Sequence, residues 1–586
     1  MTSFIILTTI ILSLIALLYI WEFHKSKIFQ KHRDFFICAG ITFIFAAYAF
    51  TNLGNFQSPQ NYFQENRAVY INFGYYTDIR RIQFMTGRRE NEIFRIEFSS
   101  DRIIWEYLYI ETRGVFAWDF RNVIVRARYA GLIPVSYEVQ LMEVGFRDAE
   151  NNLVPVVSVN DEGMNLFDEQ HMIPLQPRDY MHSMYFDEIF YSRAAYELMH
   201  GMKPNEITHP HLGKIIISRG IEIFGMTPFG WRFMSALAGT ILLVFLYFFA
   251  LAIFKSSFWA GFAAFIFAFD FMHFVQSRIG MLDVFVVLFI VGMYFFMYKY
   301  SRLNFFKDRL GKTLIPLFFS GIFTGLAIAT KWSGLYGAVG IALIFFITIG
   351  KRYCEYKENP EEHKNFKKYL EITIVCCVGF FVIIPAVIYA SSYIPRRVAG
   401  TMYPQLSFLH ALVQVQIDKM NFHLFLNAEH PFSSYWWEWL INRRPVFYFG
   451  NTVSEGLVQG INSFGNPLIW WGGLPAFAYT IYKAFKKNFV PLFLVIGYLS
   501  MLIPWIVFSR TAFIWYYYPN VIFLVLMLTY AIKESGFKPR FACFFAGGVF
   551  VLFLLFYPVL SGVPVSADYV RRFLLWPFMG DWVLIQ

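Results

Sequence analysis

Long apolar runs alternate with short charged segments over most of the chain, and each run is long enough for a membrane-crossing helix. A cleaved signal peptide is the alternative for the first run, but no basic segment precedes it and no small-residue cleavage site follows it. We predict about twelve transmembrane helices. We place them at residues 2–21, 35–53, 234–253, 257–274, 281–298, 314–330, 333–350, 370–392, 466–484, 489–508, 512–531 and 541–560.

Residues 56–184 follow a different pattern, with frequent charges and short stretches in which apolar and polar residues alternate. Stretches such as RIIWEYLYIET and YEVQLMEVGF have the period of two that indicates β-strands. We predict a β-sandwich of about 110 residues, inserted after the second span. It contains no catalytic motif, and we interpret it as a structural or carbohydrate-contacting module.

The charges between the spans indicate which loops face the cytoplasm, because short cytoplasmic loops are enriched in Lys and Arg. The basic loops are 25–33, the single Lys255, 299–312, 351–368, 483–487 and 533–540. The extracytoplasmic face then carries residues 56–184, 185–230 and 393–465 and the C-terminal tail. The resulting parts are two N-terminal helices (1–55), the β-domain (56–184), a loop with the central helices (185–392), a second loop (393–465) and a C-terminal four-helix region with its tail (466–586).

The composition agrees with a multi-pass membrane protein, since 57% of the 586 residues are hydrophobic and only 15% are charged. In soluble domains about a quarter are charged. The net charge of +10 is explained by the basic loops, so we expect no nucleic acid partner. The five cysteines fall in predicted spans or cytoplasmic loops, which predicts neither a disulfide framework nor a zinc site.

Conspicuous polar clusters all fall on the predicted extracytoplasmic face. They are Asp187-Glu188 with HPHLGK (209–214), Gln276-Ser277-Arg278 with Asp283, KWSG (331–334), the segment His430 to Pro445, and Arg510 with FIWYYYP (513–519). Arg278 and Lys331 alone are compatible with snorkelling to the interface, and Trp436, Trp437 and Trp439 with an aromatic belt. Polar clusters without a shared role would, however, be distributed over both faces of the membrane. In addition, acidic residues near membrane depth are energetically costly and usually functional.

The residue types in these clusters indicate one kind of chemistry. A carboxylate can act as general base on a hydroxyl nucleophile. Arginines and a lysine can hold a phosphate, and aromatic rings can stack on a sugar or flank a lipid. At the edge of a bilayer, this set predicts glycosyl transfer from a lipid-linked phosphosugar.

These motifs, in this order, resemble the protein O-mannosyltransferases in their bacterial form, from about residue 180 to the C-terminus. The resemblance is carried by the DE pair with HPHLGK, by QSR with LD (276–283), by KWSGL (331–335), by HP, WWEW and RP (430–445), and by Arg510 with YYYP. The chain departs from the family pattern in its inserted β-domain, in His211 instead of a second proline, and in Tyr516 instead of a histidine.

The resemblance implies a GT-C type glycosyltransferase in the plasma membrane, with its active site on the extracytoplasmic face. Mannose would pass from polyprenyl-phosphate-mannose to Ser or Thr hydroxyls of exported proteins, with inversion. Asp187 would be the general base, and Glu188 would orient it or the acceptor. The donor phosphate and sugar would be held by Arg278, Lys331, Arg510, Gln276 and Asp283.

Further residues are expected to support the site from the acceptor side. They are His209, His211, Lys214, His430, Trp436, Trp437, Trp439 and Arg444. We assign no metal, although a mixed set of acids and histidines can hold a divalent cation.

Two alternatives remain open. One is a related lipid-phosphosugar transferase that acts on a glycolipid or a cell-wall polymer, or that transfers another sugar. The other is a secondary transporter, which would show inverted repeats, broken helices and charges near the bilayer midplane. The sequence shows neither inverted repeats nor midplane charges, which favours an enzyme.

Overall fold

The computed structural model describes residues 31–61, 63–64, 67–137, 139–176, 178–425, 430–507, 511–576 and 582–585. It contains two compact units. The helical unit comprises Met1–Thr51, Glu197–Ile217 and Met234–Gln586, and the β unit comprises Asn52–Tyr196 and Ser218–Phe233. The predicted span 2–21 lies outside the described residues.

Nine helices in the described part of the chain are long and apolar enough to cross a membrane. They are α2 (Lys31–Phe50), α5 (Pro228–Phe254), α8 (Asp283–Arg302), α9 (Leu310–Thr330), α10 (Gly334–Glu358), the combined α11 (Phe366–Val378) and α12 (Ile384–Ser391), α17 (Phe489–Val507), α18 (Tyr518–Glu534) with the 3₁₀ turn before it, and α19 (Pro539–Ser561). They confirm a polytopic helical protein.

Two predicted spans take other forms. Span 466–484 corresponds to α16 (Pro467–Phe485), a 19-residue helix that is not among the nine. Span 257–274 is divided into α6 (Ser257–Ala268) and α7 (Phe271–Gln276). The division falls at Asp270, whose side chain accepts a hydrogen bond from the backbone N–H of His273 and starts a new helix.

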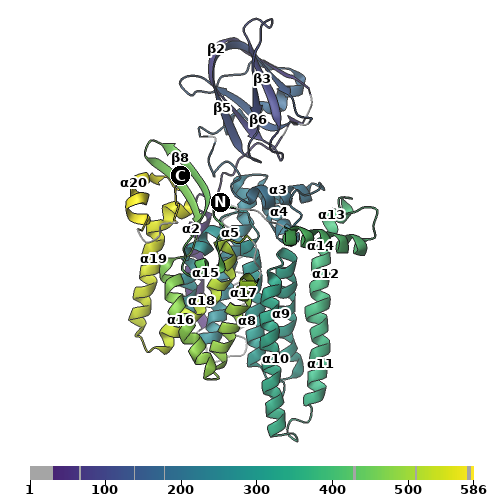
Figure 1. Cartoon of the computed structure of the whole chain (residues 1–586), viewed down its shortest axis with the longest axis vertical. Helices are drawn as coiled ribbons and strands as arrows, with labels where there is room; N and C mark the ends of the chain where they lie inside the picture. The colour runs from purple at the N-terminus through teal and green to yellow at the C-terminus, as the bar shows by residue number, and fades with distance from the viewer. Residues whose placement is uncertain are drawn as a thin grey trace. The chain divides into compact units, whose positions relative to one another are not determined.

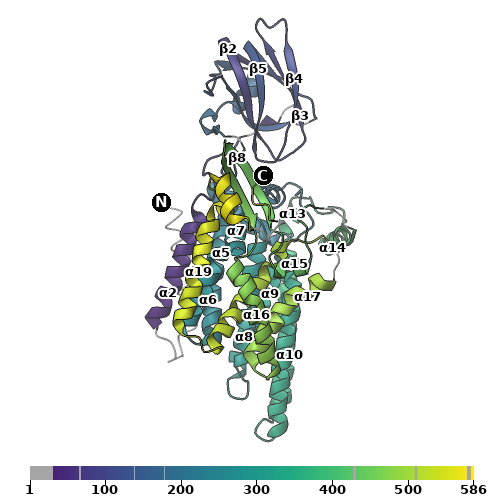
Figure 2. The same ribbon diagram turned by 60° about the vertical axis from the view of Figure 1, so that its left-hand side comes forward.

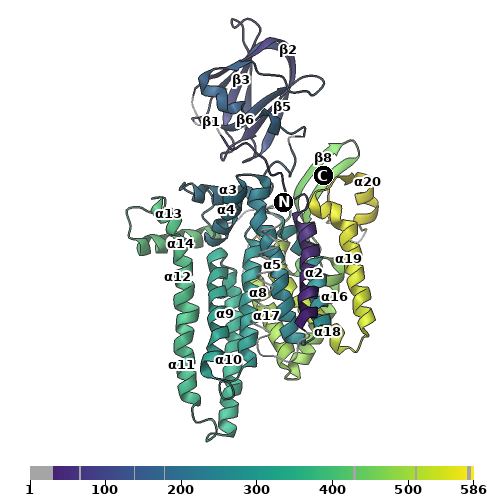
Figure 3. The same cartoon turned by 180° about the vertical axis from the view of Figure 1, so that it is seen from behind.

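The membrane-length helices form a buried centre and an exposed periphery. In the apolar stretches of α5, α8 and Ile514–Glu534, 89%, 83% and 89% of the residues are buried, against 11% in Phe366–Ser391. Figures 1 and 3 show α9, α10 and the column of α11 and α12 side by side. Figure 2 shows α2 next to α19, and the rings of Tyr48 and Phe553 lie 5.6 Å apart between them.

The β unit contains a seven-stranded antiparallel sheet of order β1-β6-β2-β5-β3-β4, with β7 also paired to β2. Its strands are β1 (Phe63–Gln64), β2 (Val69–Thr86), β3 (Ile93–Ser99), β4 (Glu106–Glu111), β5 (Trp118–Pro134), β6 (Gln140–Arg147) and β7 (Ser158–Val159). The β-rich character of this region is confirmed. The predicted β-sandwich would have two separate sheets, but all seven strands belong to one sheet. The long strand β2 changes register twice, and such irregularities bend a strand and allow one sheet to fold over a core. Apolar side chains from several strands of this sheet form a buried core.

The segment predicted as the loop 393–465 is largely structured. It contains α13 (Ile394–Val398), α14 (Phe408–Phe425), α15 (Trp436–Leu440), β8 (Val446–Ser454) and β9 (Leu457–Ser463). The strands β8 and β9 form a small sheet with β10 (Val565–Ser566). A local core around Tyr393, Met402, Ala411 and Val415 holds α14 in place.

Candidate active site

Asp187 lies directly before α3 (Glu188–Met199), in the β unit. Its carbonyl accepts hydrogen bonds from the N–H groups of Phe190 (3.0 Å) and Tyr191 (3.1 Å), so it caps the helix. The residue before it, Phe186, has φ +51°, a left-handed conformation that costs about 1–3 kcal/mol outside glycine and is concentrated at functional sites. The half-buried Asp187 therefore sits at a helix N-terminus, an environment that favours negative charge.

Glu188 is fully buried and anchors the start of α3. The Nε and Nη2 atoms of Arg232 donate to its two carboxylate oxygens at 2.7 and 2.8 Å. The indole N–H of Trp231 (3.1 Å) and the backbone N–H of Tyr185 (3.3 Å) donate to the same carboxylate. These contacts hold the backbone beside Asp187, and the orienting role expected for Glu188 stays a prediction.

Arg232 extends this anchor to the segments before α3. Its remaining N–H groups donate to three backbone carbonyls, those of Leu53, Tyr180 and Ser183, at 3.0, 2.7 and 2.9 Å. Since a buried charge is costly unless it is paired and hydrogen-bonded, this dense network stabilises one conformation of the chain around Asp187.

A cavity of about 430 Å³ in the helical unit brings together parts of three predicted motifs. Its walls contain Thr208, His209 and Pro210, then Lys331, Trp332 and Ser333, and also Tyr336, Met420, His423, Leu424, Trp505, Val507 and Tyr516. Its size is within the range of small-molecule sites. Arg510, predicted to bind the donor phosphate, lies outside the described residues.

Lys331 and Asp283 form an ion pair beside this cavity. Lys331 directly follows α9 and Asp283 begins α8, and the Lys331 Nζ lies 2.8 Å from Oδ1 of Asp283. The other carboxylate oxygen, Oδ2, is buried without a hydrogen-bond partner among the described residues. The Lys331 ammonium also lies 5.1 Å from the ring centre of Tyr516. A cation held in this way can be shared with an incoming phosphate.

Aromatic rings form one wall of the cavity. Tyr516, at the position where the family has a histidine, stacks on Trp505 with centroids 4.4 Å apart and planes at 9°. Trp439 packs edge-on against both rings. The predicted tryptophans therefore separate, because Trp439 is buried while Trp437 is 41% exposed and stacks on Tyr435.

Other residues of the same motif have structural contacts. Trp436 is half-buried at the start of α15. His430 packs edge-on against Phe513, with centroids 5.0 Å apart. The guanidinium of Arg444 donates to the carbonyl of Ser433 at 2.9 Å. None of these three is among the residues that line the 430 Å³ cavity.

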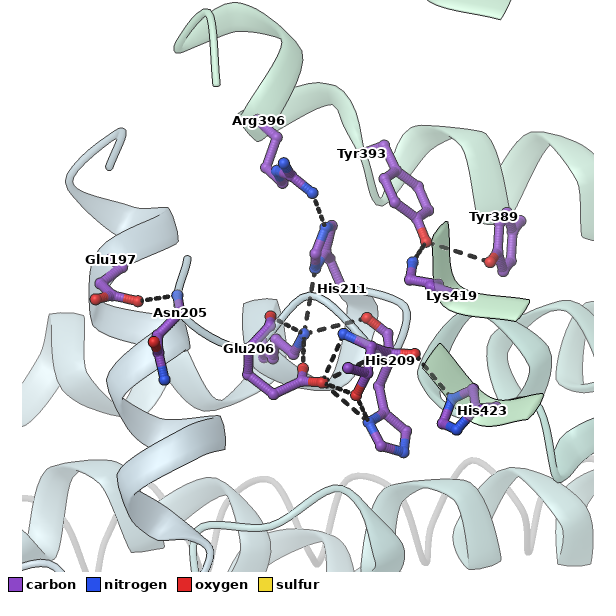
Figure 4. Close-up of polar contacts among 12 residues, drawn as sticks. Glu197, Asn205, Glu206, His209, His211, Tyr389, Tyr393, Arg396, Lys419 and His423 are labelled. Atoms are coloured by element: carbon purple, nitrogen blue, oxygen red, sulfur yellow. Dashed lines mark hydrogen bonds and ion pairs between the residues drawn. The ribbon is translucent and has the colours of Figure 1, made fainter. Parts of the chain in front are cut away.

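A buried charge cluster lies behind the cavity, just before α4 (Leu212–Phe224) (Figure 4). The Glu206 carboxylate pairs with the ammonium of Lys214 and accepts from the backbone N–H of Thr208 (2.8 Å) and of His209 (3.0 Å). The Nδ1 atom of His209 lies 3.1 Å from it. Burial raises the pKa of Glu206, but Lys214 and His209 outweigh burial and hold that pKa well below its usual value.

His211 occupies the centre of this cluster between two cations. Its Nδ1 lies 3.4 Å from the Lys214 Nζ, and its Nε2 lies 3.5 Å from Nη1 of Arg396. Burial, followed by Lys214, Lys419 and Arg396, lowers the pKa of His211 well below 6.5. The imidazole is therefore neutral at physiological pH and lies between the positive charges of Lys214 and Arg396.

A second cavity, of about 550 Å³, lies on the other side of Thr208 and is rich in cations. Lys203, Arg396 and Lys419 contribute to its walls, with Asp418 as the acidic partner. Lys419 is buried on α14 and donates to the hydroxyl of Tyr393. Burial is the largest reason why the pKa of Lys419 is lowered to about 6.

Arg278 and Gln276 do not line the 430 Å³ cavity. The Nη1 atom of Arg278 donates to the carbonyls of Tyr48, Ala49 and Thr51 at 3.1, 2.8 and 2.6 Å, and so caps the C-terminus of α2. The Gln276 amide donates to the Tyr448 hydroxyl at 2.7 Å. A phosphate-binding role for Arg278 stays a prediction, and its observed contacts are those of a helix cap.

Several residues of this region were missed by the sequence reasoning. Glu206 stands three positions before His209 in a segment that the sequence shows to be polar, so this spacing could have predicted a contact between the two side chains. Lys419 and Arg396 belong to elements that the pattern did not predict. Trp505 lies in an apolar helix and carries no signal of its own.

Comparison with known proteins identifies the family. A family model described as dolichyl-phosphate-mannose-protein mannosyltransferase matches residues 208–398. A second model, the C-terminal four TMM region of protein-O-mannosyltransferase, matches residues 408–577. Together the two models cover more than half of the chain, and both lie C-terminal to the seven-stranded sheet.

Two curated relatives are named polyprenol-phosphate-mannose–protein mannosyltransferase. The Corynebacterium glutamicum protein is 27% identical over 484 residues, which is 72% of this chain and 89% of the relative. The Mycolicibacterium smegmatis protein is 26% identical over 442 residues, which is 65% of this chain and 84% of the relative.

The fold is shared with a solved structure, the S. cerevisiae protein O-mannosyltransferase Pmt1-Pmt2 complex bound to the sugar donor. The match has a TM-score of 0.59 at 12% identity and covers 67% of this chain and 89% of the yeast chain. The two consecutive family models, the relatives and the shared fold lead to one conclusion. The chain belongs to the protein O-mannosyltransferase family.

Proposed function

We propose that this protein transfers mannose from polyprenyl-phosphate-mannose to Ser or Thr hydroxyls of exported proteins. The observation that carries the proposal is the 430 Å³ cavity, which joins three family motifs next to the Lys331–Asp283 ion pair. The names of the curated relatives supply the donor and the class of acceptor. A cavity with a cation at the ends of membrane-length helices suits a donor whose lipid tail stays in the bilayer.

Asp187 is proposed as the general base. Its carboxylate takes the proton of the acceptor hydroxyl while the hydroxyl oxygen attacks the anomeric carbon of mannose. The bond between that carbon and the phosphate oxygen breaks, and the phosphate leaves with the electron pair. Attack from the side opposite the leaving group inverts the anomeric configuration. Base catalysis of this kind contributes about 10²–10⁴-fold.

Lys331 is proposed to stabilise the phosphate as negative charge develops on it. The Asp283 carboxylate holds the ammonium in place before the donor arrives, so the charge is oriented without further reorganisation. Arg510 and Arg278 are proposed as additional phosphate ligands from the family resemblance. No step of this mechanism requires a metal ion, and we expect EDTA to leave the transfer rate unchanged.

The active site is proposed to face the extracytoplasmic side, on the basis of the basic loops on the other side. A labelling experiment with a membrane-impermeant maleimide on intact cells tests this orientation. Gln405→Cys, exposed beside the second cavity, should be labelled, while the native Cys354 at the end of α10 should be labelled only after permeabilisation. The reverse result would overturn the topology.

The activity itself is tested with purified protein, polyprenyl-phosphate-mannose and a Ser/Thr-rich peptide. Mass spectrometry should detect one added hexose on the peptide, and Asp187→Asn should abolish it. Parallel reactions with a glycolipid acceptor, a cell-wall polymer and a donor carrying another sugar distinguish the related transferases. Transfer only to a non-protein acceptor would overturn the proposal.

A further inference from the structure

The outer face of the sheet in the β unit carries a cavity of about 510 Å³, unrelated to the family motifs. Its lining residues belong to the neighbouring strands β7, β2, β5 and β3 and to the loop between β3 and β4. Its volume is within the roughly 300–1,000 Å³ of small-molecule sites.

Two side chains that line this cavity, Tyr70 and Glu97, converge over a glycine between them. Tyr70, Gly131 and Glu97 are register partners in one row across β2, β5 and β3. A Cβ atom on Gly131 would lie 3.4 Å from the Tyr70 ring and 3.6 Å from Oε2 of Glu97, so both side chains lean over it. Glycine within a strand often marks the close approach of a ligand. The neighbouring residues Ile71 and Ala130 point into the core on the opposite face.

Two aromatic rings form a wedge in the lining of the cavity. The rings of Tyr70 and Trp105 have centroids 6.2 Å apart and planes at 59°. Tyr70 is 51% exposed, although it lies in the middle of the sheet. Exposed aromatic rings that converge on a hollow provide flat apolar surfaces for a ligand.

Charged and polar groups surround the wedge. The guanidinium of Arg102 lies 4.2 Å from the ring centre of Tyr129, and Arg102 itself has φ +72°, a strained conformation for a residue with a side chain. Its carbonyl accepts from the indole N–H of Trp105 at 3.3 Å, which ties the loop together. Asn72 lines the same cavity.

We propose that this cavity binds a pyranose residue of a glycan. A pyranose ring has an apolar C–H face, which matches the aromatic wedge, and a rim of hydroxyls that both donate and accept. The Glu97 carboxylate accepts hydrogen bonds, the Arg102 guanidinium donates them, and the Asn72 amide can do both. Arg95 already pairs with Oε1 of Glu97 at 2.6 Å, whereas Oε2 is the oxygen that lies over Gly131. An apolar peptide side chain would cover these polar groups without hydrogen bonds to them, which is unfavourable. The proposal is independent of the proposed transfer reaction.

The test uses the full-length protein in nanodiscs, free of glycosidic detergents that would compete. Isothermal titration and saturation-transfer NMR measure binding of methyl α-mannoside, mannobiose, methyl glucoside and N-acetylglucosamine. An O-mannosylated peptide and the same peptide without sugar are further ligands. We expect at least one pyranoside to bind with a Kd in the millimolar range or tighter. Tighter binding of the mannosylated peptide would show that the bound pyranose comes from the product glycan. Tighter binding of a glycan without mannose would show that it comes from another polysaccharide.

Variants then locate the binding. Gly131→Leu displaces the Tyr70 and Glu97 side chains that line the cavity, and Trp105→Ala removes one ring. Each should weaken pyranoside binding at least tenfold. Gly131→Ala, whose added Cβ makes only ordinary contacts, reports on folding, and Tyr137→Ala removes an exposed ring outside the cavity as the matched control. Both controls should bind normally, and mannosyl transfer to a short peptide should be unchanged in all four. Absence of pyranoside binding, unchanged binding in Gly131→Leu and Trp105→Ala, or binding of only the unmodified peptide would overturn the proposal.

Discussion

Lys331 and Asp283 are joined by a buried ion pair of 2.8 Å, although 48 residues separate them in the sequence. The pair lies beside the 430 Å³ cavity, and one oxygen of Asp283 has no hydrogen-bond partner among the residues described. A buried pair contributes little net stability, but removal of one partner leaves an uncompensated charge. The pair therefore offers a direct way to test whether the cation receives the donor phosphate.

Asp283→Asn should lower the free energy of unfolding by about 3–5 kcal/mol, because Lys331 is left buried without its counter-ion. A bound donor phosphate replaces that counter-ion, so donor should raise the unfolding temperature more in Asp283→Asn than in the wild type. Thermal unfolding with and without polyprenyl-phosphate-mannose measures both effects. Asp308→Asn, which removes the acid of the more exposed Lys312 pair, is the control and should change stability by about 0.5 kcal/mol or less. An equal donor effect in both proteins would argue against phosphate binding by Lys331.

Asp187→Asn should reduce kcat by at least about 10²-fold while donor affinity changes less than twofold, because the amide cannot accept the hydroxyl proton. Single-turnover transfer and donor titration separate the two quantities. Asp179→Asn, in the same unit, is the matched control and should retain activity, since the amide oxygen can still accept the hydrogen bond from the Met181 N–H. Near-normal turnover by folded Asp187→Asn would refute the base assignment.

Glu206→Gln should destabilise the protein by about 3–5 kcal/mol, since it leaves the fully buried Lys214 ammonium without a carboxylate. Glu222→Gln, on the same helix as Lys214, removes the partner of the exposed Arg219 and should cost about 1 kcal/mol or less. Chemical or thermal unfolding in nanodiscs compares the two variants. Equal effects of the two variants would mean that the Glu206 cluster does not hold the segment before α4.

His211 should make stability depend on pH in the acidic range. Lys214, Arg396 and Lys419 surround the ring, with Glu206 as the nearest acid, and the pKa of His211 is well below 6.5 in the folded state. Below pH 6.5 the His211 side chain therefore binds a proton in the unfolded chain but not in the folded chain. The free energy of unfolding consequently falls as pH decreases.

His211→Gln removes this titration. The slope of unfolding free energy against pH between about 5 and 6.5 should fall by up to about 1.4 kcal/mol per pH unit, the value for one proton. Denaturant unfolding at several pH values measures the slope. His410→Gln, on the exposed side of α14, should leave the slope unchanged. An identical slope in wild type and His211→Gln would show that His211 is protonated in both states.

The prediction of helices from the sequence succeeded because each span has a local apolar signal. From residue 35 onward, every predicted span overlaps a helix or a pair of helices. The break at Asp270 was missed because a helix-capping interaction does not change the mean hydropathy of the run. Alternating patterns predicted the strands of the β unit, but the pattern is the same for one bent sheet and for two flat ones.

The sequence by itself determined the membrane class, the basic loops and the family motifs, because these depend on composition and on residues close together in the chain. Only the tertiary structure decided which of the polar residues meet. Lys331 pairs with Asp283 and lines a cavity with His209 and Tyr516, whereas Arg278 turns to the end of α2. Glu206 pairs with Lys214, Lys419 lines the second cavity with Thr208, and Tyr70, Glu97 and Trp105 line a cavity on the β unit. Such pairings depend on packing between distant segments, which local patterns do not encode.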